Sequence, residues 1–136
     1  MPPNKTRASG TMTEAQYIAF VKSALRSKSR FWKPLSDTVK EARVRKGVYL
    51  CNGCKQEVPK SVVIEGKRTN NIFCDHVKPV VDPVEGFVGW NSFINNLYCE
   101  RENLQVLCKD CHDKKSKDER TVRSNNKKEK NDQTEI

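Results

Sequence analysis

Two Cys-x-x-Cys pairs constrain the fold of this chain more than any other feature of its sequence. Cys51 and Cys54 form the first pair, and Cys108 and Cys111 form the second. Four thiolates match the tetrahedral, sulfur-only site of structural zinc. The 53 residues between Cys54 and Cys108 exceed the roughly 15–20 of a simple zinc ribbon. We therefore predict one zinc-stapled domain, with a substantial segment inserted between its two cysteine pairs.

The alternatives to zinc are disulfides, redox-active thiols and thiols that are merely buried. Disulfides belong to oxidising compartments, and residues 1–10 lack the apolar stretch of a secretory signal. We therefore expect a cytoplasmic protein with reduced thiols, which favours zinc. Cys74 and Cys99 have no partner at metal-ligand spacing, and we expect them to pack as small apolar side chains.

A zinc site would also account for the low apolar content of the chain. Hydrophobic residues make up 35% of the 136 residues, against roughly 45–50% in typical globular domains. Metal binding adds to the free energy of folding, so zinc can compensate for a small core. No apolar run approaches the roughly 18 residues that a membrane span requires, and we expect no association with a membrane.

The charge of the chain is positive and unevenly distributed. Lys and Arg number 26 against 17 Asp and Glu, a net charge of +9, which favours a polyanionic partner such as DNA. Residues 1–46 carry 11 basic and 3 acidic side chains, residues 47–116 carry 9 of each, and residues 117–136 carry 6 and 5. We predict a basic, largely helical arm (1–46), a central domain (47–116) and a polar flexible tail (117–136). A solvated helix face is the alternative interpretation of the arm.

Apolar spacing predicts short strands around the cysteines and helices elsewhere. Thr13 and Gln16 form a capping box for the first helix, and Pro34 fits the first turn of the second. Gly53 is expected to permit the tight backbone turn between the first two cysteines. The predicted helices are 13–28, one starting at 34, 90–98 and one starting at 111, and the predicted strands are 48–51, two within 61–77, and 104–108.

Both histidines stand beside metal-ligand residue types. Asp75 precedes His76, and His112 directly follows Cys111. A carboxylate and an imidazole suit Mg²⁺ or Mn²⁺, with positions left for water and a phosphate oxygen. A neutral imidazole at His76 could deprotonate a water molecule aimed at phosphorus, oriented by the side-chain amide of Asn103. The alternative, non-catalytic interpretations are a surface hydrogen bond for the Asp-His pair and packing near zinc for His112.

These motifs resemble a known family. The segments "CDHVKPV" and "ENLQVLCKDCHDKK", together with the paired Cys-x-x-Cys motifs, resemble the zinc-stapled HNH endonucleases, and "DPVEGFVGWNSFI" is similar to members encoded by tailed bacteriophages. The resemblance covers roughly Val48–Lys115. It implies an α+β fold with a small ββα-metal, treble-clef-like core that a four-cysteine zinc site holds together. In this chain we expect the helical basic arm before this core and a disordered C-terminal tail after it.

The resemblance also implies a role for each matching residue. Asp75 and His112 correspond to the ligands of the catalytic metal, Mg²⁺ or Mn²⁺, and His76 to the general base. The central asparagine corresponds to Asn103, which shapes the loop and holds the base. Asn91, Asn95 and Asn96 also lie between the histidines, but Asn103 precedes the strand that leads to Cys108, as in the family. Asp113, directly after His112, departs from the pattern and could tune the metal or cap a turn.

The function that follows is a metal-dependent DNA endonuclease, acting in a host cytoplasm if it is phage-encoded, with phage DNA processing or packaging as the candidate process. Two alternatives remain: a non-catalytic zinc-ribbon DNA-binding protein, and an accessory subunit that works with phage terminase or other packaging proteins. The basic side chains expected to contact DNA phosphates are Lys78, Lys114, Lys115, Arg26, Arg30, Arg43 and Arg45.

Overall fold

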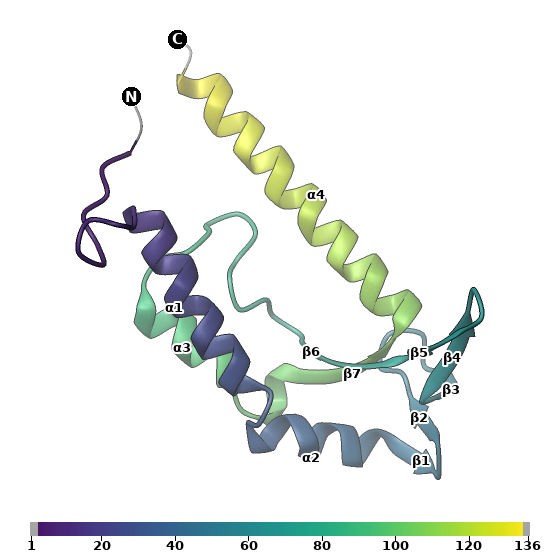
Figure 1. Cartoon of the computed structure of the whole chain (residues 1–136). Helices are drawn as coiled ribbons and strands as arrows, with labels where there is room; N and C mark the ends of the chain where they lie inside the picture. Colours follow the sequence, from purple (N-terminus) through teal and green to yellow (C-terminus); the bar gives the residue numbers. More distant parts are fainter. Residues whose placement is uncertain (1–2, 135–136) are drawn as a thin grey trace. The chain divides into compact units, whose positions relative to one another are not determined.

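The chain combines four α-helices with short β-strands in its described part, which confirms the α+β class. The computed structural model describes the backbone of residues 3–134 and the side chains of residues 3–127. It divides into two compact units, the first ending at Trp32 and the second beginning at Lys33. Figure 1 labels the helices and strands along the chain.

The first unit contains one helix, α1 (Glu14–Ser29). Its predicted capping box is confirmed: the Gln16 backbone N–H donates to Thr13 Oγ1 at 3.2 Å, and the Thr13 N–H donates to Gln16 Oε1 at 2.9 Å. Arg7 pairs with Glu14 at 2.8 Å. The capping box satisfies two backbone donors at the start of α1, the N–H groups of Thr13 and Gln16, which an uncapped helix end would leave without partners.

The second helix, α2 (Lys33–Ala42), belongs to the second unit and not to a separable arm. Thr38 is only 1% exposed, and Val39 and Ala42 pack against the core cluster of Tyr49, Ile72 and Val106. The sequence placed the domain boundary at residue 46, because residues 1–46 carry most of the positive charge whereas residues 47–116 carry no net charge. The structure places it at Trp32, because the apolar face of α2 is buried.

Seven short strands form three small antiparallel sheets in the described part of the chain. The first sheet has the order β1-β2-β3, so residues 43–45, which were expected in the helical arm, form a strand instead. The second sheet is the β4-β5 hairpin, and the third pairs β6 with β7. The strands are β1 (Arg43–Arg45), β2 (Val48–Leu50), β3 (Glu57–Pro59), β4 (Ser61–Ile64), β5 (Lys67–Asn70), β6 (Ile72–His76) and β7 (Leu104–Cys108).

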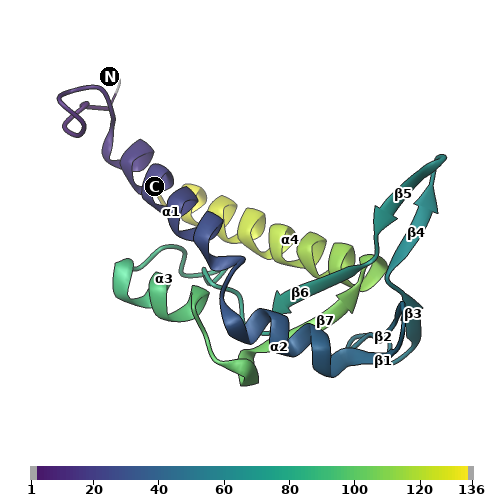
Figure 2. The ribbon, with the colours of Figure 1, turned by 60° about the horizontal axis from the view of Figure 1, so that its bottom comes forward.

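The β6-β7 pair lies between two helices. The segment between its strands contains α3 (Trp90–Leu97) and the 3₁₀ turn η1 (Arg101–Asn103), and α4 (Lys109–Thr134) begins directly after β7. One face of the pair packs against α2 through Ile72 and Val106. The other face meets the start of α4, as Figure 2 shows. The chain therefore contains two antiparallel strands followed by a helix, with a cysteine pair at their junction.

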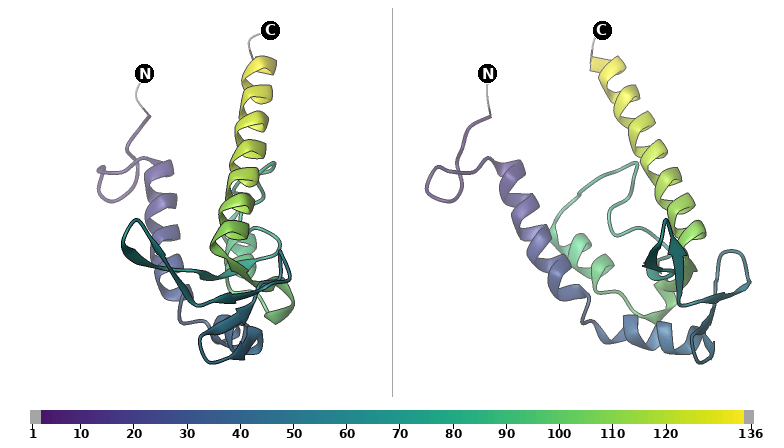
Figure 3. Two further views of the ribbon diagram at one scale, coloured as in Figure 1. Left: turned by 90° about the vertical axis from the view of Figure 1, so that its right-hand side faces the viewer. Right: turned by 45° about the vertical axis from the view of Figure 1, so that its right-hand side comes forward.

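The flexible tail expected from residue 117 onward is wrong for residues 117–134, because they continue α4. Figure 3 shows α4 as one continuous helix. The sequence here has almost no apolar residues, but lysine, arginine, glutamate and glutamine have high helix propensity. Ion pairs such as Lys115–Glu119, at 2.6 Å, add support along the helix surface. A polar composition therefore did not exclude a helix.

Candidate metal centre and the neighbouring histidine site

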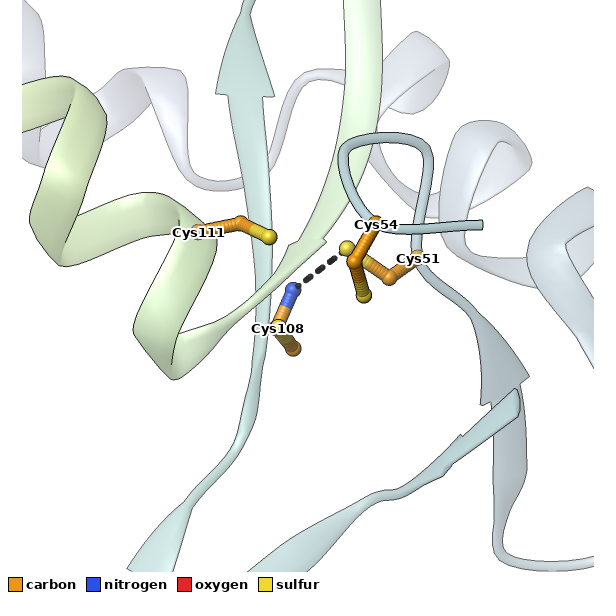
Figure 4. A group of neighbouring side chains, drawn as sticks. All are labelled: Cys51, Cys54, Cys108 and Cys111. Carbon is orange, nitrogen blue, oxygen red and sulfur yellow. Dashed lines mark hydrogen bonds between the residues drawn. The ribbon is translucent and has the colours of Figure 1, made fainter. Parts of the chain in front are cut away.

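The four cysteines of the two Cys-x-x-Cys pairs lie together, with all four Sγ atoms within 4.8 Å of one another. Figure 4 shows Cys51 and Cys54 on the loop after β2, Cys108 at the end of β7 and Cys111 in the first turn of α4. A tetrahedral zinc site with Zn–S bonds of about 2.3 Å requires sulfur atoms at such separations. This cluster could hold a metal ion such as zinc, as the spacing of the cysteines predicted.

Backbone hydrogen bonds fix the loop that carries the first two cysteines. The Lys55 N–H donates to the Cys51 carbonyl at 2.9 Å, and the Cys51 N–H donates to the Gln56 carbonyl at 3.0 Å. The loop is joined to β7 because the Asn52 N–H donates to the Val106 carbonyl at 2.8 Å. The Cys108 N–H donates to Cys51 Sγ at 3.3 Å. The two cysteine pairs are therefore held in place by the backbone as well as by any bound metal.

The thiols of the cluster cannot all ionise without a cation. Burial acts to raise the pKa of Cys51, but backbone N–H groups of Cys108, Cys54 and Gly53 donate to its sulfur and lower its pKa to about 6. Burial and the neighbouring thiols raise the pKa of Cys111 to about 12. One sulfur is thus prepared to be a thiolate, whereas Cys111 requires a positive charge nearby. This donor set fits a divalent cation.

Gly53 is required for space and not for an unusual backbone conformation. It is absent from the positive-φ residues of the described chain, whereas Lys55, two residues later, has a φ of 61°. A Cβ atom on Gly53 would lie 3.0 Å from Cys111 Sγ and 3.2 Å from Leu107 Cδ2. The sequence predicted that Gly53 permits the tight turn between the first two cysteines, but its φ is not positive, so steric room rather than backbone freedom requires a glycine here. The residue lets the first loop approach the start of α4.

Gly53→Ala is therefore expected to weaken zinc binding, on the order of tenfold, because the added methyl group pushes against Cys111. Competition with a chromophoric chelator measures the affinity. Gly47→Ala is the control: Gly47 has a φ of 76° and no atom within 4 Å of an added Cβ, so any loss of zinc affinity in this variant reflects its lower folding stability alone, and Gly53→Ala should lose more. Equal zinc affinities for Gly53→Ala and the wild type would contradict the steric argument.

Asp75 and His112 lie at the interface between β6 and α4. Asp75 Oδ2 accepts from Lys115 Nζ of α4 at 2.9 Å and from Gln105 Nε2 of β7 at 3.4 Å. The His112 ring stacks on Phe73, with centroids 4.5 Å apart and planes 14° from parallel. Phe73 and Asp75 are two residues apart on β6 and so share one face of the strand. The structure thus brings the two predicted ligands to the same interface.

His112 Nδ1 is buried and has no hydrogen-bond partner in the described part of the chain. The nearest acidic atom, Asp113 Oδ1, is 3.8 Å away, and the Asp113 carboxylate accepts instead from Lys109 Nζ. A buried nitrogen without a partner is costly. A cation bound to this nitrogen would remove that cost, so His112 is chemically suited to be a metal ligand.

His76 points to the other side of the strand. Its Nε2 lies 3.0 Å from the carbonyl oxygen of Leu97 at the end of α3. A carbonyl oxygen only accepts, so Nε2 carries the proton and the Nδ1 lone pair is left as an acceptor. The ring therefore has the tautomer of a general base. Leu97 cannot be recognised from the sequence as a partner of His76, because any residue type can make a contact through its backbone carbonyl.

Asn103 clamps the turn that follows β6. Its Oδ1 accepts from the Lys78 N–H at 2.8 Å, and its Nδ2 donates to the Lys78 carbonyl at 3.2 Å. Its own carbonyl accepts from the Val77 N–H at 2.8 Å. Asn103 thus shapes the loop next to His76, while the contact to the imidazole comes from Leu97. Any effect of Asn103 on the imidazole passes through the backbone of this loop.

Two of the basic side chains expected to contact DNA are engaged within the protein. Lys115 Nζ contacts Asp75, the His76 carbonyl at 3.0 Å and Glu119 at 2.6 Å, which uses all three of its donors. Arg45 pairs with Glu57 at 3.0 Å. The side chains of Lys78, Lys114 and Arg43 are exposed, and the remaining two candidates, Arg26 and Arg30, lie on and next to α1.

Within the described residues, the four cysteines are the only group of three or more acidic, histidine or cysteine ligand atoms close to one another. Asp75, His76 and His112 do not form a second such group. In the same part of the chain, no helix is both long enough and apolar enough to cross a membrane. Comparison of the chain with protein-family models, curated proteins and solved structures finds no match.

Proposed function

We propose that this chain is a metal-dependent DNA endonuclease of the HNH type, with structural zinc in its four-cysteine cluster. One observation carries the proposal. Asp75 of β6 contacts Lys115 of α4, and His112 of α4 stacks on Phe73 of β6, whereas His76, the residue next to Asp75, contacts Leu97 of α3. The end of β6 thus carries a candidate metal ligand and the candidate base at adjacent positions, and His112 lies on the helix that packs against this strand.

This arrangement suits the hydrolysis of a phosphodiester bond. In an in-line displacement the attacking and leaving oxygens lie on opposite sides of phosphorus. Asp75 and His112 would hold a Mg²⁺ or Mn²⁺ ion, whose charge would stabilise the phosphate and the leaving oxygen. His76 Nδ1 would accept a proton from the attacking water, and the Leu97 carbonyl would stabilise the imidazolium that results.

One contact favours a second candidate, a non-catalytic zinc-stapled DNA-binding protein. The Lys115 ammonium is 2.9 Å from Asp75 Oδ2, which is the geometry of a purely structural ion pair. In that function Asp75 and His112 would join β6 to α4 and bind no cation. The nuclease is the better-supported function, because a structural ion pair gives no reason for the unpartnered His112 Nδ1.

Plasmid nicking separates the two functions. Zinc-loaded protein is expected to convert supercoiled plasmid into the open-circular form when Mg²⁺ or Mn²⁺ is added. A weak chelator should stop cleavage at a concentration that leaves the zinc in place, because thiolate sites hold zinc far more tightly than oxygen-rich sites hold Mg²⁺. Binding without cleavage under any divalent cation would favour the non-catalytic function.

A further inference from the structure

The β4-β5 hairpin is not used by the proposed site, and its side chains are largely exposed. Its strands pair with each other in the register Val63↔Arg68 and Ile64↔Lys67. The turn is Glu65-Gly66, with φ values of 51° and 79°, so both turn residues have the positive φ of a type I′ turn. Figure 2 shows the turn directed away from α2 and α3. An isolated two-stranded hairpin is marginally stable in water, so a partner surface would stabilise this one.

The charge of the hairpin is positive and uncompensated. Lys60, Lys67 and Arg68 surround one acidic residue, Glu65, although residues 47–116 as a whole carry no net charge. Ion pairs neutralise basic side chains elsewhere in the described chain, among them Arg7, Lys33, Arg45, Arg101, Lys109 and Lys115. None of those pairs includes a basic residue of the hairpin. Arg68 Nη1 instead donates to Ser61 Oγ at 2.8 Å, across the two strands.

Each face of the hairpin tip combines an apolar and a basic side chain. Residues paired across two strands share a face, so Val63 lies beside Arg68 and Ile64 beside Lys67. Val63 is 62% exposed and Ile64 41% exposed. A two-stranded ribbon fits the major groove of duplex DNA, where basic groups contact phosphate or guanine and apolar groups contact the thymine methyl.

The base of the hairpin is fixed to the rest of its unit. Asn71, which joins β5 to β6, is only 7% exposed. Its Nδ2 donates to the Pro59 carbonyl at 3.0 Å, and its Oδ1 accepts from the Lys109 N–H at 3.2 Å. The hairpin is thereby held relative to β6, the strand that carries Asp75 and His76.

We propose that the β4-β5 hairpin is a DNA-binding ribbon that enters a groove of the duplex to one side of the cleavage site. This inference rests on the proposed function. Nine residue steps separate Lys67 from His76, which is at most about 30 Å at the rise of a β-strand. That length corresponds to roughly nine base pairs. The hairpin therefore adds contacts within about one helical turn of the cleaved bond.

The test compares two doubly substituted proteins that each lose two positive charges. The hairpin variant is Lys67→Gln/Arg68→Gln, and the matched control on α2 is Lys33→Gln/Lys40→Gln. Fluorescence anisotropy with a duplex of about 30 base pairs, at several salt concentrations, gives affinity and salt slope. The hairpin variant should bind roughly tenfold more weakly at low salt and show a slope smaller by about two. Its hydroxyl-radical footprint should be shorter on one side only.

The control should keep the footprint of the wild type. Circular dichroism and zinc content should be unchanged in both variants, because few contacts join the hairpin to other elements. A hairpin variant with the footprint and slope of the wild type would overturn the ribbon while the nuclease proposal stood. An equal effect of the control variant would also overturn it, since charge alone would then explain the loss. If the wild type neither cuts nor binds duplex DNA, the proposed function itself fails.

Discussion

Cys108→Ser is expected to leave the chain without zinc and unfolded at room temperature. Structural zinc contributes roughly 10–16 kcal/mol in small zinc domains, whereas a typical domain is stable by only about 5–15 kcal/mol. The core that would remain is small: ten apolar residues are buried in the described part of the chain, and three of them are cysteines. Elemental analysis and a circular dichroism melt measure the two losses. Chelation of zinc from the wild type should produce the same unfolded state.

Cys99→Ser provides the control for this prediction. Cys99 is buried, 9% exposed, but lies outside the cluster, so its replacement should cost about 1 kcal/mol and leave the zinc in place. Burial raises the pKa of Cys99, which is consistent with a neutral thiol that packs like an apolar side chain. A Cys108→Ser protein that melts cooperatively without zinc would show that the cluster is not a structural metal site.

His76→Ala is expected to reduce DNA cleavage by roughly 10²–10⁴-fold, the range typical for the loss of a general base. Zinc content and folding should be retained, because the substitution removes one hydrogen bond, worth about 1 kcal/mol. Affinity for duplex DNA, measured without divalent cations, should also be unchanged, since His76 contributes no net charge when neutral. Single-turnover cleavage of a labelled duplex measures the rate.

His76→Gln distinguishes a base from a structural residue. The glutamine amide can donate to the Leu97 carbonyl in place of the imidazole, but it cannot accept the proton of a water molecule at neutral pH. Its rate should be as low as that of His76→Ala. If His76→Gln restored cleavage to the wild-type rate, His76 would serve only to join β6 to α3, and the base would have to be found elsewhere.

Features that depend on local spacing could be predicted from the sequence. The cysteine spacing indicated the cluster, because two residues of separation set how two thiols approach one ion. The pairing of Thr13 with Gln16 predicted the start of α1. Asp75 and His112 were expected to bind one metal ion; they lie on β6 and α4, two elements that contact each other.

Features that depend on long-range packing could not be predicted. Apolar spacing and Pro34 indicated a helix at the position of α2, but not that its apolar face packs on β7. Lys115 has the sequence context of a phosphate-binding lysine, and only the fold shows that it faces Asp75 and Glu119. The alternation within residues 61–77 predicted two strands, whereas the structure has three, β4, β5 and β6. The exposure of the β4-β5 hairpin depends on how the other described elements pack, which the alternation does not reveal.

The first turn of α4 carries, at consecutive positions, a residue of the four-cysteine cluster and a residue that contacts β6. Cys111 belongs to the four-cysteine cluster, and the next residue, His112, stacks on Phe73. Each residue of an α-helix is rotated by about 100° from the one before it. One residue inserted between Cys111 and His112 would leave all four sulfurs in place and turn His112 and Lys115 away from β6. A substitution can therefore change either the cysteine cluster or the contacts of His112 with β6. An insertion or deletion between Cys111 and His112 would disturb the position of one relative to the other.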